Sequence, residues 1–494
     1  MDLVIEELKE RLRDKDLARL FENAFPNTLD TTVRWHVDGI SSHAAKSRPY
    51  SSPGQWEGAQ SFIVTGDINA EWLRDSTNQL AQYQKLAKIS PEIFNLILGA
   101  INTQTEFIIE SPYCNAFQPP SPSELFPTYT GSNDVVHPAY EHSKVFECKY
   151  EIDSLASFLS LSNQFYNATQ SVDFVTNRWR RALDLILAVL DHQSQGTFEP
   201  DTNRFVRNEY TFKRHAWTGT ETLNLDGIGN PIAGDIGLIR SAFRPSDDAT
   251  IFPFFVPGNA MMSVELERTA QMLKAAKDEA AAGMGNQDIN MLAESLLQKS
   301  QTIKDAIYEH AVINHKIYGK VFAYEVDGFG SHLLMDDANI PSLLSLPLMG
   351  FIDVSNEIYQ NTRRMILSSR GNPYFLAGNA FTGIGGPHIG LRNAWPMSVL
   401  VQAMTTDHRS ATTAADEEIR LCLESVKNVS LGGLINESVD VDLDWHSSTR
   451  TWFAWANSVF AQTVLWVAKT RPGLIFEEDR PFDMVKFVQH EADS

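Results

Sequence analysis

Two loops of the chain carry carboxyl groups in settings that suit acid–base chemistry. The first reads SAFRPSDDA (residues 241–249), so Asp247 and Asp248 follow a Pro-bent turn and precede the apolar run 251–256. A carboxyl group beside apolar surface and a like charge has a raised pKa, which a general acid requires. The plainer interpretation is that Ser246 or Asp247 caps a helix by accepting backbone N–H groups.

The second loop reads GGLINESVD (residues 432–440) and contains Glu437. Two glycines precede this glutamate, and Trp445, Trp452 and Trp455 follow it. A single glutamate on a loop is usually solvated. An aromatic neighbourhood, however, is typical of a ligand pocket, so a functional role and a solvated one both stay open.

Two further acidic clusters stand where helices are expected to begin. The segment TGDINAEWLRD (residues 65–75) contains Asp67, Arg74 and Asp75, and KYEID (residues 149–153) adds two more acids. Both have an ordinary explanation, because acids are favoured as caps and in the first turn of a helix. Arg74 and Asp75 also suit a simple surface ion pair. Taken alone, neither cluster identifies a site.

Other kinds of catalytic centre are not indicated. The chain has no dinucleotide fingerprint, no phosphate-binding loop and no nucleophile elbow. Its histidine pairs at a spacing of five match no zinc motif. Asp440, Asp442 and Asp444 alternate like the start of a calcium loop, but Trp445 stands where such a loop needs glycine. We therefore expect neither a metal nor a cofactor.

Acids that stand beside aromatic side chains, without a metal or a phosphate loop, point to sugar chemistry. Aromatic faces stack on the C–H face of a pyranose, while Asp, Asn and Arg bind its hydroxyl groups. Cleavage of a glycosidic bond needs two carboxyl groups, one to protonate the leaving oxygen and one as base or nucleophile. The residues themselves indicate this reaction class and no particular sugar.

Apolar residues recur along the chain at steps of three and four, which predicts amphipathic helices. These helices must position the loops. The clearest pattern covers residues 172–190. Similar patterns predict helices over residues 3–23, 71–89, 91–109, 150–167, 259–282, 287–315, 338–349, 353–369, 393–406, 410–427 and 449–469. Short strands are expected near residues 63–65 and 321–325.

About twelve helices without a domain-splitting linker fit an all-α fold, an (α/α)6 barrel with an inner and an outer ring of helices and long active-site loops. We expect one catalytic domain over residues 1–494. Two stacked helical domains are the alternative, with a weak boundary at residues 277–288.

Composition excludes several classes of protein. Asp and Glu number 62 against 41 Lys and Arg, a formal charge of −21 over 494 residues. Such an excess disfavours nucleic acid and anionic membranes as partners. An apolar fraction of 43% excludes wholesale disorder. We expect a monomer that acts on a neutral or cationic substrate.

The compartment is inferred from the N-terminus and the cysteines. The first fifteen residues form a charged amphipathic pattern rather than a signal peptide. Three cysteines cannot all pair within one chain, which suits a reducing environment. These features predict a cytoplasmic protein. Asn-x-Ser/Thr patterns at Asn167, Asn428 and Asn436 matter only for a secretory or trimmed form.

The chain resembles glycoside hydrolase family 125, the exo-acting α-1,6-mannosidases, at these same residues. The matching segments are TGDINAEWLRDS (65–76), SPYCNAF (111–117), CKYEIDSL (148–155), SAFRPSDDA (241–249), FAYEVDGFGSHLLMDDANIPSLLS (322–345), GLINESVD (433–440) and TRTWFAWANSVF (449–460). They run in order over nearly the whole chain.

The resemblance implies an (α/α)6 barrel and a metal-independent, inverting hydrolase that releases mannose from the non-reducing end of α-mannoside oligosaccharides. It places the general base at Glu437. It places the general acid in the 244–248 loop, at Asp247 or alternatively at Asp248. The chain departs from the family pattern at Asn436 and Cys148, which leaves the carboxylates unchanged.

The resemblance also suggests residues that hold the terminal mannose. They are Asp67, Trp72, Arg74, Asp75, Asn115, Trp217, Arg244, Arg450 and Trp455. Two other functions remain open on the sequence. One is a different (α/α)6 glycosidase, such as an α-glucosidase or a trehalase-like enzyme, and the other is a non-catalytic mannan-binding protein.

Overall fold

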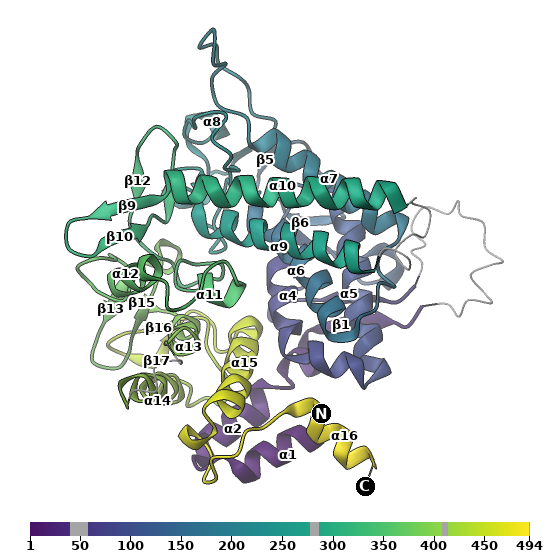
Figure 1. Ribbon diagram of the computed structural model, residues 1–494, viewed down its shortest axis with the longest axis vertical. Coiled ribbons are helices and arrows are strands. Elements are labelled where there is room, and N and C mark those ends of the chain that lie inside the picture. The colour runs from purple at the N-terminus through teal and green to yellow at the C-terminus, as the bar shows by residue number, and fades with distance from the viewer. Residues whose placement is uncertain (40–57, 277–285, 408–412, 494) are drawn as a thin grey trace, which may run out of the picture.

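A computed structural model describes residues 1–39, 58–276, 286–407 and 413–493 (Figure 1). Helices dominate it. In chain order they are α1 (Asp2–Arg11), α2 (Lys15–Ala24), α4 (Leu73–Leu80), α5 (Pro91–Glu110), α6 (Ile152–Thr169), α7 (Asn177–Gln193), α8 (Asn224–Gly227), α9 (Val256–Ala275), α10 (Asn286–His310), α11 (Leu346–Met349), α12 (Glu357–Ile366), α13 (Pro396–Met404), α14 (Thr413–Asn428), α15 (Ala454–Thr470) and α16 (Met484–Asp493). Most of the boundary proposed at residues 277–288 falls outside the described residues.

Most predicted helices are present, and local chemistry explains where they begin. The pattern at 172–190 corresponds to α7, which starts after Thr176 because that side chain accepts the Trp179 N–H. Helix α5 starts where Ser90 accepts the Ile93 N–H and Pro91 occupies the first turn, a position that needs no N–H donor.

The helix predicted over residues 338–349 is wrong for most of its length. Only the single turn α11 forms there. Pro341 and Pro347 interrupt the segment, since proline lacks an N–H and clashes with the preceding turn. The buried carboxylate of Asp336 meanwhile accepts the backbone N–H groups of Leu343 and Leu344. The chain therefore forms a packed loop.

Three predicted helices are divided. Residues 3–23 form α1 and α2, which break where Asp14 caps the second helix by accepting the N–H groups of Asp16 and Leu17. Residues 71–89 form a two-residue strand, the helix α4 and a 3-10 helix over Ala81–Lys88. The pattern at 287–315 ends as a helix at His310 and continues as the strand β9 (Val312–His315). Periodicity alone did not detect these breaks.

Five helices pack in succession and form the centre of the molecule. Helix α13 packs on α15, α15 on α4, α4 on α6, and α6 on α9 (Figure 1). These helices are buried on almost every side; α6 is buried at each position from Ile152 to Asn163. A second set lies against them, with α14 on α13, α2 on α15, α5 on α6 and α10 on α9.

The strands are short and lie at the ends of helices. They are β1 (Val33–Val37), β2 (Gln60–Ile63), β3 (Glu71–Trp72), β4 (Ala116–Phe117), β5 (Val135–His137), β6 (Val145–Glu147), β7 (Thr211–Lys213), β8 (Phe254–Phe255), β9, β10 (Gly319–Phe322), β11 (Glu325–Val326), β12 (His332–Leu333), β13 (Phe375–Ala377), β14 (Thr382–Ile384), β15 (Asn393–Ala394), β16 (Val439–Asp440) and β17 (Asp444–Ser448). The strand expected near residues 63–65 lies earlier, as β2, which ends at Ile63. The one expected near 321–325 is present as the two strands β10 and β11.

Three antiparallel sheets of three strands support the loops that carry the candidate residues. In sheet β3–β4–β6, strand β3 ends at Trp72. In sheet β12–β11–β8, strand β8 follows the 244–248 loop, and in sheet β15–β16–β17, strand β16 follows Glu437. Each short strand is thus paired on at least one side, which holds the loop beside it in place.

A disulfide joins Cys114 to Cys148, and Cys422 is buried and free. The disulfide links the segment before β4 to the segment after β6, directly beside Asn115 and Lys149. Disulfides persist mainly in oxidising compartments, so this pairing weighs against the cytoplasmic location, which stays a prediction. None of the helices within the described ranges is both long and apolar enough to cross a bilayer.

Candidate active site

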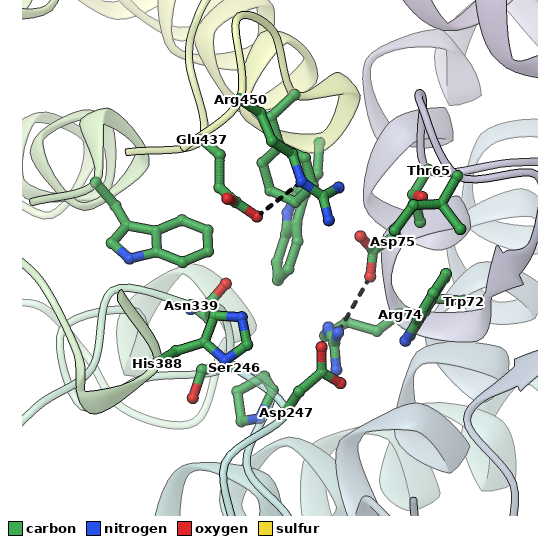
Figure 2. Close-up of a pocket in the computed structure, with 15 residues that line it drawn as sticks. Thr65, Trp72, Arg74, Asp75, Ser246, Asp247, Asn339, His388, Glu437 and Arg450 are labelled. Atoms are coloured by element: carbon green, nitrogen blue, oxygen red, sulfur yellow. Dashed lines mark ion pairs between the residues drawn. The ribbon is translucent and has the colours of Figure 1, made fainter. Parts of the chain in front are cut away.

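A pocket with about 460 Å³ of open space lies between four sets of loops (Figure 2). Its walls come from residues 65–75, the 245–247 turn, residues 339–395 and the segment 437–455. The lining residues are Thr65, Ile68, Trp72, Arg74, Asp75, Pro245, Ser246, Asp247, Asn339, His388, Trp395, Glu437, Arg450, Phe453 and Trp455.

A tight turn aims Asp247 into this pocket. The Asp247 N–H donates to the Arg244 carbonyl at 2.9 Å, and the Arg244 N–H donates to the Asp248 carbonyl at 2.8 Å. Asp247 sits at φ +69°, a left-handed conformation that aspartate tolerates better than most residues. The same turn sends the next side chain away from the pocket, so Asp248 is only 1% exposed.

Arg244 anchors the turn rather than lining the pocket. Its Nε donates to Glu325 Oε1 at 2.6 Å, and its guanidinium lies 5.3 Å from the centre of the Tyr324 ring. The other oxygen of Glu325 accepts the N–H groups of Ile251 and Phe252. One buried ion pair therefore fixes both ends of the acidic loop to β11.

The electrostatic environments of Asp247 and Asp248 differ. Burial by itself raises the pKa of Asp247, but the charges of Lys149, Arg74 and His388 act against it and hold the pKa below its ordinary value. For Asp248, burial dominates and raises the pKa to about 6, although His388 opposes it. The raised pKa expected for the acidic pair is thus found at Asp248 and not at Asp247. Asp247 reaches the pocket and Asp248 does not, so access and not pKa favours Asp247 for contact with a substrate.

Glu437 is held from two sides on the opposite wall. The Thr449 hydroxyl donates to its Oε2 at 2.6 Å, and Arg450 Nε lies 3.4 Å from its Oε1. Next to it, the Asn436 amide donates to the carbonyls of Arg450 and Thr451. Glu437 is 7% exposed, and its carboxylate faces the pocket (Figure 2).

Arg74 organises the acidic floor of the pocket. Its guanidinium contacts Glu151 at 2.7 Å, Asp75 at 3.2 Å and Asp153 at 3.5 Å, and it lies 5.3 Å from the centre of the Trp455 ring. Burial raises the pKa of Asp75 to about 6 even though Arg74 lowers it. Arg74 thus keeps several carboxyl groups together that would otherwise repel one another.

The structure brings together seven of the predicted site residues and places five elsewhere. Those that line the pocket are Trp72, Arg74, Asp75, Asp247, Glu437, Arg450 and Trp455. Asp67 pairs with Arg450, Asn115 is buried and donates to Glu151, and Trp217 is 100% exposed outside the lining. Arg244 and Asp248 belong to the same turn as Asp247 but do not line the pocket.

Sequence reasoning missed Thr65, Ile68, Pro245, Ser246, Asn339, His388, Trp395 and Phe453 as lining residues. Six of them lie inside the motif segments, namely Thr65, Ile68, Pro245, Ser246, Asn339 and Phe453. His388 and Trp395 lie in the GIGGPHIGLRNAW stretch, where glycines beside a histidine were the available signal.

Several buried polar atoms around the pocket have no hydrogen-bond partner in the described part of the chain. They include Thr65 Oγ1, Trp72 Nε1, Arg74 Nε, Asp247 Oδ1, Trp395 Nε1 and Trp455 Nε1. Buried polar groups normally have partners, so this concentration indicates a ligand with many polar groups. The described residues contain no cluster of His, Cys, Asp or Glu suited to a metal ion.

The family model described as "Metal-independent alpha-mannosidase (GH125)" matches residues 14–465. The chain belongs to glycoside hydrolase family 125. Both carboxylate loops lie within the match, and the resemblance that the motifs indicated is confirmed. As a member of family 125 the protein is an α-mannosidase, a glycoside hydrolase of metal-independent type.

Two relatives extend the comparison over almost the full chain. The Schizosaccharomyces pombe "Meiotically up-regulated gene 157 protein" is 49% identical over 476 residues, which cover 96% of this chain and 87% of that protein. A solved Streptococcus pneumoniae metal-independent α-mannosidase, in a non-productive complex with α-1,6-mannobiose, is 30% identical, with a TM-score of 0.77, and the match covers 94% of this chain and 97% of that one.

Proposed function

We propose that this family 125 protein is an exo-acting α-1,6-mannosidase that works with inversion of configuration. The observation that carries the proposal is the placement of Asp247 and Glu437 on opposite walls of one pocket, each from its own loop (Figure 2). An inverting glycosidase needs an acid on one side of the bond and a base, with room for a water, on the other.

Each carboxyl group has a defined part in the proposed reaction. Asp247 donates a proton to the glycosidic oxygen as the bond to the anomeric carbon breaks. Glu437 removes a proton from the water that attacks the opposite face of that carbon. Thr449 orients Glu437 by a hydrogen bond and Arg450 by an ion pair.

The pocket chemistry supports a sugar in the position between these groups. Trp72, Trp395 and Trp455 supply aromatic surface, and Asp75 and Arg74 supply an acceptor and a donor for hydroxyl groups. The linkage is inferred from the streptococcal relative, whose complex contains α-1,6-mannobiose.

Exo action is supported by the way one side of the pocket closes. Arg450 Nη1 pairs with Asp67 Oδ1 at 3.1 Å, which joins the N-terminal and C-terminal loops. Trp452 lies against Gly66, where a Cβ would come within 3.1 Å of the indole ring and φ is +136°. Only glycine suits that backbone conformation and that contact. A chain end therefore fits this pocket better than the middle of a polymer.

We further propose that the helices form the (α/α)6 barrel expected from the sequence. The succession α13, α15, α4, α6 and α9 supplies five members of an inner ring, and α11, which packs on α9, stands at the sixth place as a single turn. The partner helices α14, α2, α5 and α10 then belong to the outer ring.

Hydrolysis of α-1,6-mannobiose, followed by NMR, tests the function. We expect mannose to appear first as the β-anomer and then to equilibrate. First-formed α-mannose would contradict inversion. Cleavage of α-glucosides or trehalose in preference to mannosides would favour a different glycosidase, and calorimetric binding of mannobiose without any cleavage would favour a binding protein.

A further inference from the structure

The side chains of Ser246, Asp248 and Asp337 form a buried hydrogen-bonded cluster at the acidic turn (residues 244–248). The proposed reaction does not use this cluster directly. Ser246 Oγ lies 2.8 Å from Asp337 Oδ2 and 3.2 Å from Asp248 Oδ2. All three residues are almost fully buried. A serine hydroxyl has one hydrogen to donate, so it cannot satisfy two carboxylates at the same time.

The other contacts of Asp337 show which carboxyl group receives that hydrogen. Asp337 Oδ1 accepts two hydrogen bonds, from the N–H and the side-chain amide of Asn339. With the shorter contact from Ser246, Asp337 has three donors around it, as an ionised carboxylate requires. Gly386 also packs closely on it, since a Cβ there would lie 3.0 Å from Oδ2.

Asp248 has the opposite environment. Its Oδ1 is buried with no hydrogen-bond partner among the described residues, and its Oδ2 faces the Ser246 oxygen. An ionised Asp248 would place a buried charge beside the Asp337 carboxylate, with the Thr220 side chain as a hydrogen-bond partner. A protonated Asp248 instead donates to Ser246 Oγ, and Ser246 donates to Asp337.

We propose that Asp248 is a neutral carboxylic acid that positions the turn carrying Asp247. The inference rests on the proposed function, in which Asp247 is the group that touches the substrate. The backbone connects the two roles, because the Asp248 carbonyl accepts the Arg244 N–H and so closes the turn that holds Asp247 at φ +69°.

Four other groups with charge or a titratable proton face Asp248. His388 Nδ1, from the opposite loop, lies 3.9 Å from Oδ1. Arg244 on the same turn favours ionisation of Asp248, and Asp337 disfavours it. Tyr374 interacts electrostatically with Asp248 from a further loop. With burial included, Asp248 holds its proton up to about pH 6, and above that pH its charge repels Asp337 across Ser246.

The test compares D248N with D247N. An asparagine at 248 copies the neutral acid, because its amide can donate to Ser246 at every pH. We expect D248N to retain activity within about threefold of wild type on α-1,6-mannobiose at pH 5, and D247N to lose at least 100-fold. The ratio of D248N to wild-type kcat/KM should rise as the pH increases through 6, because only the wild type loses its neutral acid at position 248. Dividing the two pH profiles cancels the titrations that both proteins share.

Two outcomes would overturn the inference while α-1,6-mannosidase activity itself stands. One is a loss of activity in D248N as large as that in D247N, which would give Asp248 a part in the proton transfer and so also overturn the assignment of Asp247 alone as the acid. The other is a ratio that stays flat from pH 5 to pH 8, which would leave Asp248 a purely structural residue.

An infrared measurement gives a readout that does not depend on activity. The difference spectrum of wild type minus D248N at pH 5 should contain the carbonyl band of a protonated carboxylic acid, and the band should fade by pH 8. Absence of the band at pH 5 overturns the inference. A band together with an inactive wild type overturns the proposed function alone. D248A, which cannot donate to Ser246, should lose activity at all pH values while its far-UV spectrum shows a folded protein.

Discussion

Arg450 joins Glu437 to Asp67 across the mouth of the pocket: its Nε lies 3.4 Å from Glu437 Oε1 and its Nη1 lies 3.1 Å from Asp67 Oδ1. The two carboxylates stand far apart in the sequence, and both contact the same guanidinium. A single guanidinium therefore orients the candidate base and closes the wall beside it. Only arginine has the length and the fork of donors to make both contacts.

Removing both contacts of Arg450 should lower activity more than removing its contact to Asp67 alone. R450M removes both contacts, and we expect kcat/KM to fall by roughly 100-fold or more. D67N leaves the contact to Glu437 intact and removes only a half-exposed ion pair, so a decrease of about threefold to tenfold is expected. Steady-state kinetics on α-1,6-mannobiose would measure both. Equal losses in the two variants would contradict the separate roles.

Removal of either candidate catalytic carboxyl group should abolish turnover. General acid–base groups contribute about 10²–10⁴-fold each, so D247N and E437Q should each lose at least 100-fold in kcat. Azide, a small nucleophile that needs no base, can restore some turnover to E437Q and none to D247N. The exposed Glu477 supplies the matched control, and E477Q should keep wild-type kinetics. Wild-type kcat in D247N would remove Asp247 from the mechanism.

Helix periodicity was sufficient to predict most of the helical frame, because one buried face repeats along each helix regardless of its partners. It failed at residues 338–349, where Pro341, Pro347 and the Asp336 side chain decide the local structure. Those contacts depend on groups that meet only in the folded chain. The sequence also gave no indication that Cys114 and Cys148, of the three cysteines, form a disulfide.

The site was predicted less completely than the helices. Motifs identified Asp247 and Glu437 but could not separate Asp247 from Asp248, since adjacent residues differ only through the turn that points them apart. His388 lacked any motif and entered the pocket through a loop from a distant part of the chain. Trp217 carries a large apolar ring, yet the structure leaves it fully exposed.

Thr449 should affect the candidate base without affecting substrate binding. Its hydroxyl donates to Glu437 Oε2 at 2.6 Å and also contacts Ser438 Oγ at 2.8 Å. T449V keeps the shape and removes the donor, so we expect kcat to fall about fivefold to 20-fold with KM nearly unchanged. T449S, which keeps the hydroxyl, is the matched control and should recover most of the loss. A T449V variant with wild-type kcat would show that solvent replaces the hydroxyl.

The disulfide between Cys114 and Cys148 should stabilise the fold near the site. It closes a loop with a sequence separation of 34, for which chain entropy predicts a contribution of up to about 4 kcal/mol. The double variant C114S/C148S should therefore unfold at lower denaturant concentration. In the absence of denaturant its kcat should be affected only weakly. C422S, which removes the buried free cysteine, controls for loss of a thiol. An unchanged unfolding midpoint in the double variant would contradict a stabilising bridge.

Buried carboxyl groups should make the protein more stable at mildly acidic pH than at alkaline pH. Burial raises the pKa of Glu71 and of Asp336 to about 8. Among the described residues Glu71 has no ion pair and is contacted by the Ile63 N–H, the Gln104 amide and the Ser76 side chain. A raised pKa in the folded state means that the folded protein binds more protons than the unfolded chain. The associated stability is fully present below the ordinary carboxyl pKa, near pH 4, and is lost as the pH rises through about 8.

The variant E71Q tests this origin of the pH dependence. Its neutral side chain can still accept the Ile63 N–H, and Gln104, whose Oε1 has no partner among the described residues, can rotate to accept the new amide. We expect the Tm of wild type to fall by a few degrees from pH 5 to pH 8 and that of E71Q to fall less. The exposed variant E477Q should follow wild type. An E71Q slope as steep as that of wild type would show that Glu71 is already ionised in the folded protein, because a glutamate that carries no extra proton has none to lose.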